Sequence, residues 1–394
     1  MKDVLFLAWR YLAFHRWKTG ILIGAITVII FLPLALELVL ERSAERLRAR
    51  AMATPLLLGA PGSPLELALG SLYFDGKPPA SLAYSAVDEL NDTGLATAIP
   101  LQLGYRVGAQ PIVGTTPEYF EFRQLRMAAG RSLAIAGEAV LGAAAAINLE
   151  TGPGDTFVTS PETVFDVTGT YPLKLRVAGV LAAAGTPDDE AVFVDLRTAW
   201  IIGGLGHGHE NLADANAANQ VLQRQENNIV GNAAVVQYRE ITPDNLREFH
   251  FHGDQKKLPL SAVIAVPADD KAGVLLEGRY QNDANGPRTV RPVAVMDELL
   301  ATVFTIRQYI LAAVALVGIA TFATTALVFL LSIRLRRAEI QTMTRIGAAP
   351  ARVTAILGSE ILLVLFASLL LASLLTGIAT AWGETLFRWL LIST

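Results

Sequence analysis

Four of the five histidines form two His-x-His pairs. His207-Gly208-His209 is followed by Glu210, and His250-Phe251-His252 is followed two residues later by Asp254. Two histidines separated by one residue point the same way on an extended strand. Neutral imidazole is the commonest metal ligand, and imidazole together with carboxylate suits Zn²⁺. The candidate zinc ligands are therefore His207, His209, Glu210, His250 and His252. Solvent-facing loop histidines without a ligand remain the alternative, because nothing in the sequence brings the two pairs together.

A short basic segment between two apolar stretches is the second candidate site. It runs from Arg336 to Ala348 and carries three arginines, and Arg352 lies beyond it. Gly347 indicates a helix end, and Pro350 stops its continuation. A basic helix held between two membrane helices is a place where another protein can push on the membrane part. From spacing alone, an equally good interpretation is that the arginines enforce topology and touch lipid headgroups.

Three apolar stretches predict membrane spans. Thr19 to Leu36 is uncharged over 18 residues, Gln308 to Ile333 over 26, and Ile361 to Gly383 over 23. About 20 apolar residues are needed to cross a bilayer. All three segments qualify as transmembrane helices. The chain contains no cysteine, which excludes a disulfide framework and a thiolate metal site.

Charge then orients the chain. The segment 41–302 holds 21 Lys/Arg and 31 Asp/Glu, a net of −10, while the remaining residues carry a net of +6. Short loops rich in Lys and Arg stay cytoplasmic. We therefore expect the N-terminus and the Arg loop in the cytoplasm, and an exported region of about 260 residues that is long enough for its own core. Its negative charge argues against nucleic-acid binding.

The exported region reads as mixed α/β. Short β-branched runs bounded by Gly, Pro or Asp predict strands at 109–113, 175–181, 191–195 and 261–266. Helices are expected at 86–91, 117–122, 198–202, 211–225 and 268–276. The predicted fold class is a membrane protein: an α-helical transmembrane bundle of three spans, with a large mixed α/β exported domain inserted between spans 1 and 2.

The predicted layout follows the chain. It comprises a cytoplasmic amphipathic helix at 1–18, transmembrane helix 1 at 19–40, a periplasmic domain at 41–302 with a stalk and an inserted subdomain near 203–232, transmembrane helix 2 at 303–333, a cytoplasmic loop and helix at 334–352, transmembrane helix 3 at 353–382 and a short periplasmic C-terminus at 383–394. Ala49-Arg50-Ala51 resembles a signal-peptidase site. The charged, helix-patterned segment 41–48 instead favours an uncleaved anchor that continues as a stalk.

Several motifs resemble those of the FtsX-like/MacB-like ABC transporter permeases, the group that includes LolC and LolE. Arg336-Arg337-Ala338-Glu339-Ile340 followed by Arg345-Ile346-Gly347-Ala348 is similar to that family's Arg-Arg-x-Glu-Ile…Gly-Ala signature. Glu360 falls where the family commonly has a glutamate. Further matches occur in the family's order at Gly114–Phe120, Gly130-Arg131, Val140–Gly142, Gly152–Thr156 and Val177–Leu181.

The resemblance implies a permease that converts ATP-driven motion of a separate subunit into periplasmic conformational change, or mechanotransmission, acting on an envelope substrate. The helix from Arg337 to Ile346 would be the coupling helix. The coupling residues implied are Arg336, Arg337, Glu339, Ile340, Arg345 and Gly347. Glu360, near the cytoplasmic end of span 3, would snorkel or pair with a loop arginine. Some relatives belong to zinc-responsive envelope systems, and by that analogy the His pairs would serve zinc or other metal handling.

Enzyme motifs are missing from the sequence. It has no Gly-x-x-x-x-Gly-Lys-Ser/Thr phosphate loop and no Gly-x-Ser-x-Gly nucleophile motif, so we expect a non-enzyme that uses ATP only through a partner. Asp188-Asp189-Glu190 follows Gly185-Thr186-Pro187 and reads as a solvated turn.

The implied partners are a LolD/MacB-type ATP-binding subunit, a second copy of the permease in a 2:2 complex, a periplasmic adaptor or substrate protein, and the lipid bilayer. The implied location is the bacterial inner membrane, with several spans and a large periplasmic domain. The alternative function is an FtsX-like regulator that controls a periplasmic partner such as a cell-wall hydrolase. A transmembrane sensor is the third possible function. A sensor would need an output domain after its second span, and the chain has only the Arg loop there.

One departure from the resemblance concerns the C-terminus. The family usually has four spans, whereas Glu384 to Thr394 is too short to cross a bilayer. We expect three spans and an exported C-terminus, with Phe387, Trp389 and Leu390 at the membrane interface. A natural truncation, a fragment and a diverged subgroup all fit this pattern.

Overall fold

The computed structural model describes residues 2–76, 79–160, 172–209, 221–225, 228–231, 238–281 and 286–392. The chain divides into two compact units. A helical unit comprises Met1–Leu47 and Glu298–Thr394, and an exported unit comprises Arg48–Asp297.

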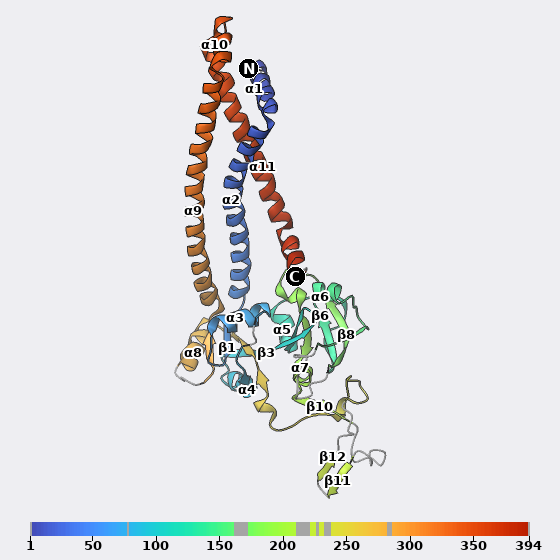
Figure 1. The fold of residues 1–394 in the computed structure, drawn as a ribbon. Helices are drawn as coiled ribbons and strands as arrows, with labels where there is room; N and C mark the ends of the chain where they lie inside the picture. Colours follow the sequence, from blue (N-terminus) through green and yellow to red (C-terminus); the bar gives the residue numbers. More distant parts are fainter. Residues whose placement is uncertain are drawn as a thin grey trace. The chain divides into compact units, whose positions relative to one another are not determined.

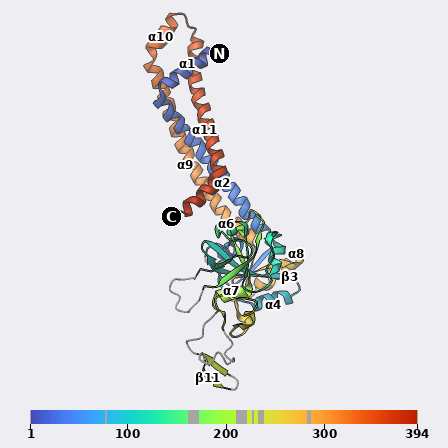
Figure 2. The same cartoon turned by 90° about the vertical axis from the view of Figure 1, so that its right-hand side faces the viewer.

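Long helices make up the helical unit (Figures 1 and 2). In chain order they are α1 (Lys2–Phe14), α2 (Arg16–Met52), α9 (Pro292–Leu335), α10 (Arg337–Arg345) and α11 (Pro350–Ile392). Within the described residues, α2, α9 and α11 are long and apolar enough to cross a membrane. Most of their large apolar side chains are exposed, as a lipid-facing surface requires. The side chains from 381 onward, including the expected interface residues Phe387, Trp389 and Leu390, lie outside the described part.

A small apolar interior and buried hydroxyls hold these helices together. Leu12, Leu22 and Val364 form the centre of the packed cluster. The Thr27 hydroxyl on α2 donates to the Ser368 carbonyl of α11 at 3.3 Å. Glu37 of α2 accepts a hydrogen bond of 2.8 Å from Arg307 of α9. Each of the three long helices therefore has a specific contact with a neighbour.

A mixed ten-stranded sheet organises the exported unit. Its strands run in the order β16-β1-β15-β3-β4-β9-β6-β8-β5, and β7 pairs with β8. The pairs β4–β9 and β6–β8 are parallel, and the other pairs are antiparallel. These strands are β1 (Leu56–Gly59), β3 (Ala96–Val107), β4 (Gln110–Thr115), β5 (Met127–Gly130), β6 (Glu138–Leu141), β7 (Thr156–Val158), β8 (Lys174–Leu181), β9 (Val192–Asp195), β15 (Ala262–Pro267) and β16 (Arg288–Val290).

Smaller elements complete this unit. The helices are α3 (Pro64–Tyr73), α4 (Ser85–Asp92), α5 (Pro117–Phe122), α6 (Ala143–Asn148), α7 (Leu196–Ile202) and α8 (Asp270–Gln281), with the 3₁₀ turns η1 (Pro187–Glu190), η3 (Leu246–Glu248) and η4 (Gln255–Lys257). Three two-stranded pairs are β10 (Gly206–Gly208) with β13 (Phe249–Phe251), β11 (Val221–Gln225) with β12 (Asn228–Gly231), and β2 (Leu82–Ala83) with β14 (Pro259–Leu260).

Two apolar clusters cover the sheet. One contains Ile112, Leu175 and Phe249, and the other contains Leu90, Trp200 and Leu260. Burial alternates along β8, as expected for a strand with a core face. A mixed α/β domain between the first and second spans is the fold class that the sequence predicts, and the structure confirms it. The helix expected at 211–225 is wrong at its end, where β11 is a strand, and 211–220 lies outside the described residues.

Candidate functional site

The basic loop folds as α10, with Arg336 as its N-cap residue. The helix ends in a Schellman motif, in which the Ala348 N–H donates to the Met343 carbonyl at 3.0 Å and the Gly347 N–H to the Thr344 carbonyl at 3.1 Å. Gly347 has φ +98°, a conformation that is costly for any residue with a Cβ. Gly347 therefore fixes where α10 stops and where the chain turns into α11.

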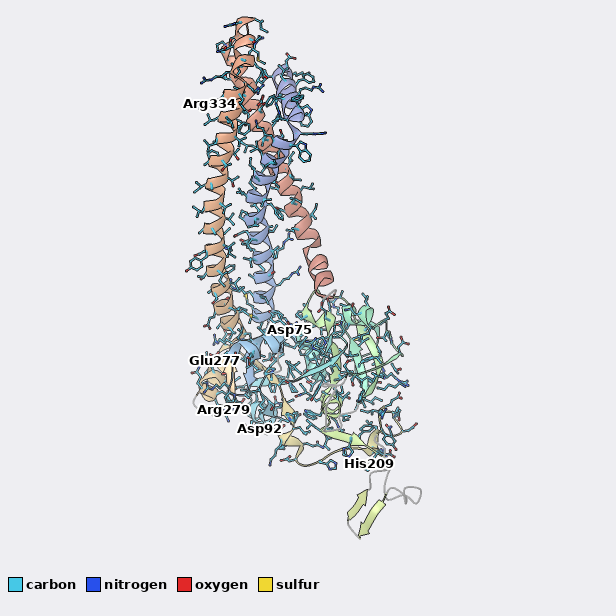
Figure 3. The ribbon with its side chains drawn as sticks, viewed as in Figure 1. Asp75, Asp92, His209, Glu277, Arg279 and Arg334 are labelled. Atoms are coloured by element: carbon cyan, nitrogen blue, oxygen red, sulfur yellow. The ribbon has the colours of Figure 1, made fainter. Side chains whose placement is uncertain are left out.

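The predicted coupling residues divide into an outward set and an inward residue. Arg337, Glu339 and Arg345 are exposed, and Ile340 is half-buried. No residue of α10 is buried, and Ile346, directly after the helix, is 80% exposed. Arg334 marks the same end of the bundle in Figure 3. Cations beside an exposed apolar side chain form a surface suited to docking another protein.

Arg336 is the inward residue. Its Nη1 donates to Glu360 Oε1 at 2.8 Å, and its Nε to Glu339 Oε2 at 3.2 Å. The guanidinium also lies 3.6 Å from the centroid of the Tyr11 ring. The Glu360 side chain is only 3% exposed. Glu360 thus pairs with a loop arginine, and this pair ties the start of α10 to α11.

The two His-x-His pairs lie on neighbouring strands. β10 and β13 are antiparallel, and His207 stands directly opposite His250. His209 and His252 each follow two residues later, so the strand period places all four rings on one face. His209 is labelled in Figure 3. His207 and His252 thus lie close together although they are 45 positions apart in the sequence.

The imidazoles form a compact cluster. Ligand nitrogens of His207, His209 and His250 all lie within 4.8 Å of one another, and His207 Nε2 lies 3.5 Å from His252 Nε2. Burial, reinforced by the neighbouring imidazoles, lowers the pKa of His207, which favours its neutral, metal-binding form. Glu210, the fifth predicted ligand, lies outside the described residues.

The opposite face of this strand pair is apolar. Gly206 pairs with Phe251 and Gly208 with Phe249. A Cβ on Gly206 would lie 2.6 Å from the Phe251 ring, and one on Gly208 would lie 2.7 Å from the Phe249 ring. The glycines therefore let both rings lie flat against β10. This explains how a glycine-rich stretch can form a strand.

A buried polar cluster in the exported unit escaped the sequence reasoning. Arg50, in the last turn of α2, pairs with Asp188 of η1 through two hydrogen bonds, and Arg50 and Asp188 both bond the Tyr119 hydroxyl. Asp188 is 1% exposed, so the prediction of a solvated turn is wrong for this residue. The available signal was Tyr119, which lies inside the motif Gly114–Phe120.

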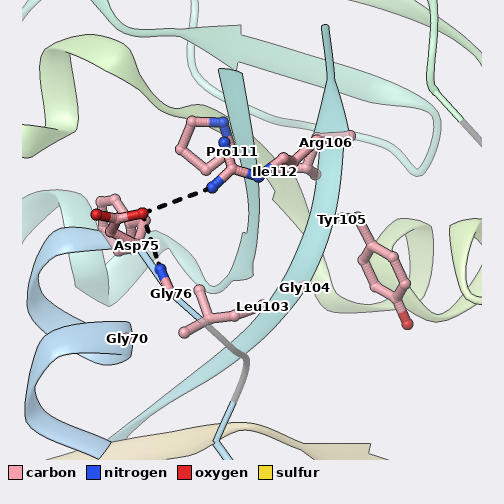
Figure 4. A pocket seen from close by; sticks show the side chains of 10 residues that line it. Gly70, Asp75, Gly76, Leu103, Gly104, Tyr105, Arg106, Pro111 and Ile112 are labelled. Atoms are coloured by element: carbon pink, nitrogen blue, oxygen red, sulfur yellow. Dashed lines mark hydrogen bonds and ion pairs between the residues drawn. The ribbon is translucent and has the colours of Figure 1, made fainter. Parts of the chain in front are cut away.

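A shallow pocket lies beside α3 and strands β3 and β4 (Figure 4). Arg106 and Asp75 border it, with 3.9 Å between their charged atoms. Asp75 also accepts from the Gly76 N–H at 2.8 Å, and Arg106 donates to the Ala109 carbonyl at 2.9 Å. These exposed groups are paired with each other and with the backbone, which is typical of a solvated rim.

Known proteins resemble the chain in its exported region. The family model described as the MacB-like periplasmic core domain matches residues 20–225, a little more than half of the chain. No curated protein matches. The periplasmic region of MacB from Actinobacillus actinomycetemcomitans is 11% identical, with a TM-score of 0.32, over 62% of this chain and 92% of that one. The extracellular domain of the ABC-type transporter YknZ from Gram-positive bacteria is 10% identical, with a TM-score of 0.32, over 60% of this chain and 98% of that one.

Proposed function

We propose that this chain works by mechanotransmission, because it belongs to the MacB-like periplasmic core domain family. The family supports an ABC transporter permease of the MacB/FtsX type. This membership confirms the resemblance found in the sequence. The family also indicates an inner-membrane protein with a periplasmic domain. In the proposed mechanism, a separate ATPase subunit pushes on α10, and the long helices pass that motion to the exported unit, which acts on an envelope substrate.

The observation that carries the proposal is the exposed basic surface of α10. Arg337 and Arg345 have exposed side chains on a helix that connects two candidate spans. Arg336 and Glu360 hold the start of this helix to α11. A force applied to the exposed side of α10 would therefore reach α11 through a fixed contact rather than through a loose loop.

The lengths of α2 and α9 support transmission along helices. α2 has 37 residues and α9 has 44, whereas about 20 cross a bilayer. One ion pair joins α2 and α9 within each of the two units. Glu37 and Arg307 lie 2.8 Å apart in the helical unit, and Arg48 Nε donates to Asp297 at 2.8 Å in the exported unit. Such pairs would make α2 and α9 move together.

The composition of the spans argues against a solute pathway through them. The three uncharged stretches identified in the sequence contain no Asp, Glu, Lys, Arg or His, and transport pathways normally need such groups inside the membrane. Glu360 is paired with Arg336 instead. In the assembly we propose, two permease copies bind two LolD/MacB-type ATPase subunits, and a periplasmic adaptor or substrate protein contacts the exported unit.

Charge reversal on α10 tests the proposal. The variant carrying Arg337→Glu and Arg345→Glu is co-expressed with the ATPase subunit and compared with Arg10→Glu, an exposed arginine on α1. We expect the double variant to insert into the membrane but to bind the ATPase at least about tenfold more weakly, a change of about 1.4 kcal/mol. Arg10→Glu should bind normally. Undiminished co-purification of the double variant would contradict the coupling role.

A further inference from the structure

We propose that His207, His209 and His250 bind one divalent ion of the late first-row transition metals, with His252 beside them as a fourth ligand drawn in by the ion and with Zn²⁺ as the first probe. The site lies wholly within the exported unit, on β10 and the end of β13. It does not rest on coupling to an ATPase, so either proposal can fail without the other.

Three of the rings lie close enough together to share one ion. Nitrogens bound to Zn²⁺ at about 2.0–2.1 Å are about 3.3 Å apart in a tetrahedron, and His207 Nε2 and His252 Nε2 lie 3.5 Å apart. The same geometry places imidazole centroids about 5 Å from one another. By ring centroids, His250 lies 4.8 Å from His207 and 5.0 Å from His209, and His207 lies 5.6 Å from His209. His252 lies 4.9 Å from His207 and 5.0 Å from His250. His209 and His252 flank the His207–His250 pair at opposite ends, so a side chain must rotate for all four to reach one ion.

The donor set selects the class of metal. All four described ligands are imidazoles, which suit Zn²⁺, Cu²⁺ and Ni²⁺. Ca²⁺ and Mg²⁺ require oxygen ligands, and the described cluster offers none. A tetrahedral arrangement of nitrogens favours Zn²⁺ over Cu²⁺, which prefers square-planar or tetragonal sites.

A backbone contact prepares one ligand for binding. His250 Nδ1 lies 3.0 Å from the Glu248 carbonyl oxygen. A carbonyl can only accept, so Nδ1 carries the proton and Nε2 keeps its lone pair when the ring is neutral. Metal-ligating histidines almost always use their second nitrogen in this way.

The apolar back of the strand pair holds the cluster in place. Phe249 is 6% exposed and belongs to one of the two cores. The Phe251 ring packs edge-on against Trp200, with 6.0 Å between ring centroids. His207 and His250 are thus mounted on strands whose other faces are fixed in the interior. A solvated loop would have no such support.

Binding should also stabilise the strands. β10 and β13 share only three residue pairs, and so short a ladder is marginal without other support. An ion held by both strands would add a cross-link there, because metal binding to a site absent from the unfolded chain contributes directly to stability. Bound Zn²⁺ should therefore slow amide exchange in segments 204–209 and 247–253.

The binding test uses the full chain in detergent, purified with an affinity tag free of histidine and stripped with a chelator. Zn²⁺ is titrated in competition with a fluorescent indicator. We expect one ion per chain with a Kd below about 10 μM. His207→Gln and His252→Gln should each weaken binding by at least about 10- to 100-fold, the cost of losing even a supporting contact. His252 is exposed, so its variant should keep the fold.

His15, between α1 and α2, provides the matched control, because it is the fifth histidine of the chain. His15→Gln should bind Zn²⁺ as the unchanged protein does. Replacing Zn²⁺ with Co²⁺ should give the intense visible absorption of a four-coordinate ion, and X-ray absorption should show nitrogen neighbours at about 2.0–2.1 Å. Binding no tighter than about 10 μM, or equal affinity in His252→Gln and His15→Gln, would overturn the four-histidine site.

Discussion

Arg50 and Asp188 are 138 residues apart in the sequence and share two hydrogen bonds, of 2.5 and 2.9 Å, inside the exported unit. Their side chains are only 7% and 1% exposed. The Tyr119 hydroxyl donates to the same carboxylate at 2.6 Å, and Thr186 does so at 2.9 Å. The last turn of α2 is thereby fixed inside the exported unit by an ion pair, and removing either partner would leave a buried charge unpaired.

Breaking this pair should be strongly destabilising. Arg50→Met leaves a buried carboxylate without its cation, which costs about 3–5 kcal/mol. The double variant Arg50→Met with Asp188→Leu should recover much of that loss, because no unpaired charge remains. Denaturant unfolding of the full chain in detergent measures both.

Arg48→Ala is the control for this comparison. Arg48 pairs with Asp297 at the surface, where the two side chains are 53% and 46% exposed, and such pairs contribute about 0.2–1 kcal/mol. A loss in Arg48→Ala as large as that in Arg50→Met would show that burial is not the cause.

The same carboxylate predicts a response to acid. Burial alone would raise the pKa of Asp188, but the hydrogen bonds and charge of Arg50, with bonds from Tyr119 and Thr186, more than offset it and hold that pKa below its ordinary value. Such a group stabilises the fold above its unfolded pKa of about 3.9, and this contribution disappears as the pH falls through the lower native pKa.

Thermal midpoints between neutral and strongly acidic pH test this sign. The stability difference between the unchanged protein and Asp188→Asn should be constant near neutral pH and should shrink below about pH 4. A difference that grows on acidification would mean that the native pKa of Asp188 is raised.

Asp188 also shows where sequence reasoning fails. Its surroundings, Gly185-Thr186-Pro187 followed by three acidic residues, have the local composition of a solvated turn. The turn does form, as η1. What buries Asp188 is Arg50, and no local pattern records a partner so distant. Strands such as β8 and β9 could be predicted because their β-branched runs are local properties.

For the histidine pairs, the sequence leaves strand and loop open for a different reason. Glycines on both sides of His207 reduce strand propensity and suggest a loop. Phe249 and Phe251 of the opposite strand supply the side-chain packing that Gly206 and Gly208 lack. The His-x-His spacing places both rings of a pair on one face of a strand, and the pairing of β10 with β13 brings the two pairs side by side.

Gly347→Ala should disturb the end of α10. An added Cβ would meet nothing within 4 Å, so the cost comes from the positive φ alone and should be about 1–2 kcal/mol. We expect weaker stimulation of ATP hydrolysis in the partner subunit, with normal membrane insertion. Gly358→Ala in α11 is the control, since its Cβ also meets nothing and Ala is favoured within a helix. Equal activity in the two variants would argue against a role for the Schellman motif.

Glu37 and Arg307 allow a charge-swap experiment on α2 and α9. Their charged atoms lie 2.8 Å apart, and the side chains are 37% and 22% exposed. Glu37→Arg and Arg307→Glu each place like charges together and should lower stability by about 0.2–1 kcal/mol or slightly more. Combining them should restore the ion pair. A double-mutant cycle on thermal stability measures the coupling, and simple additivity of the two losses would refute the contact.

The β10–β13 ribbon has two faces of opposite character, phenylalanines over glycines on one and imidazoles on the other. Sliding one strand by a single residue would exchange these faces, carrying aromatic rings into water and histidines against the core. The packing of Phe249 and Phe251 therefore selects the strand alignment, and only in that alignment do the imidazoles share one face.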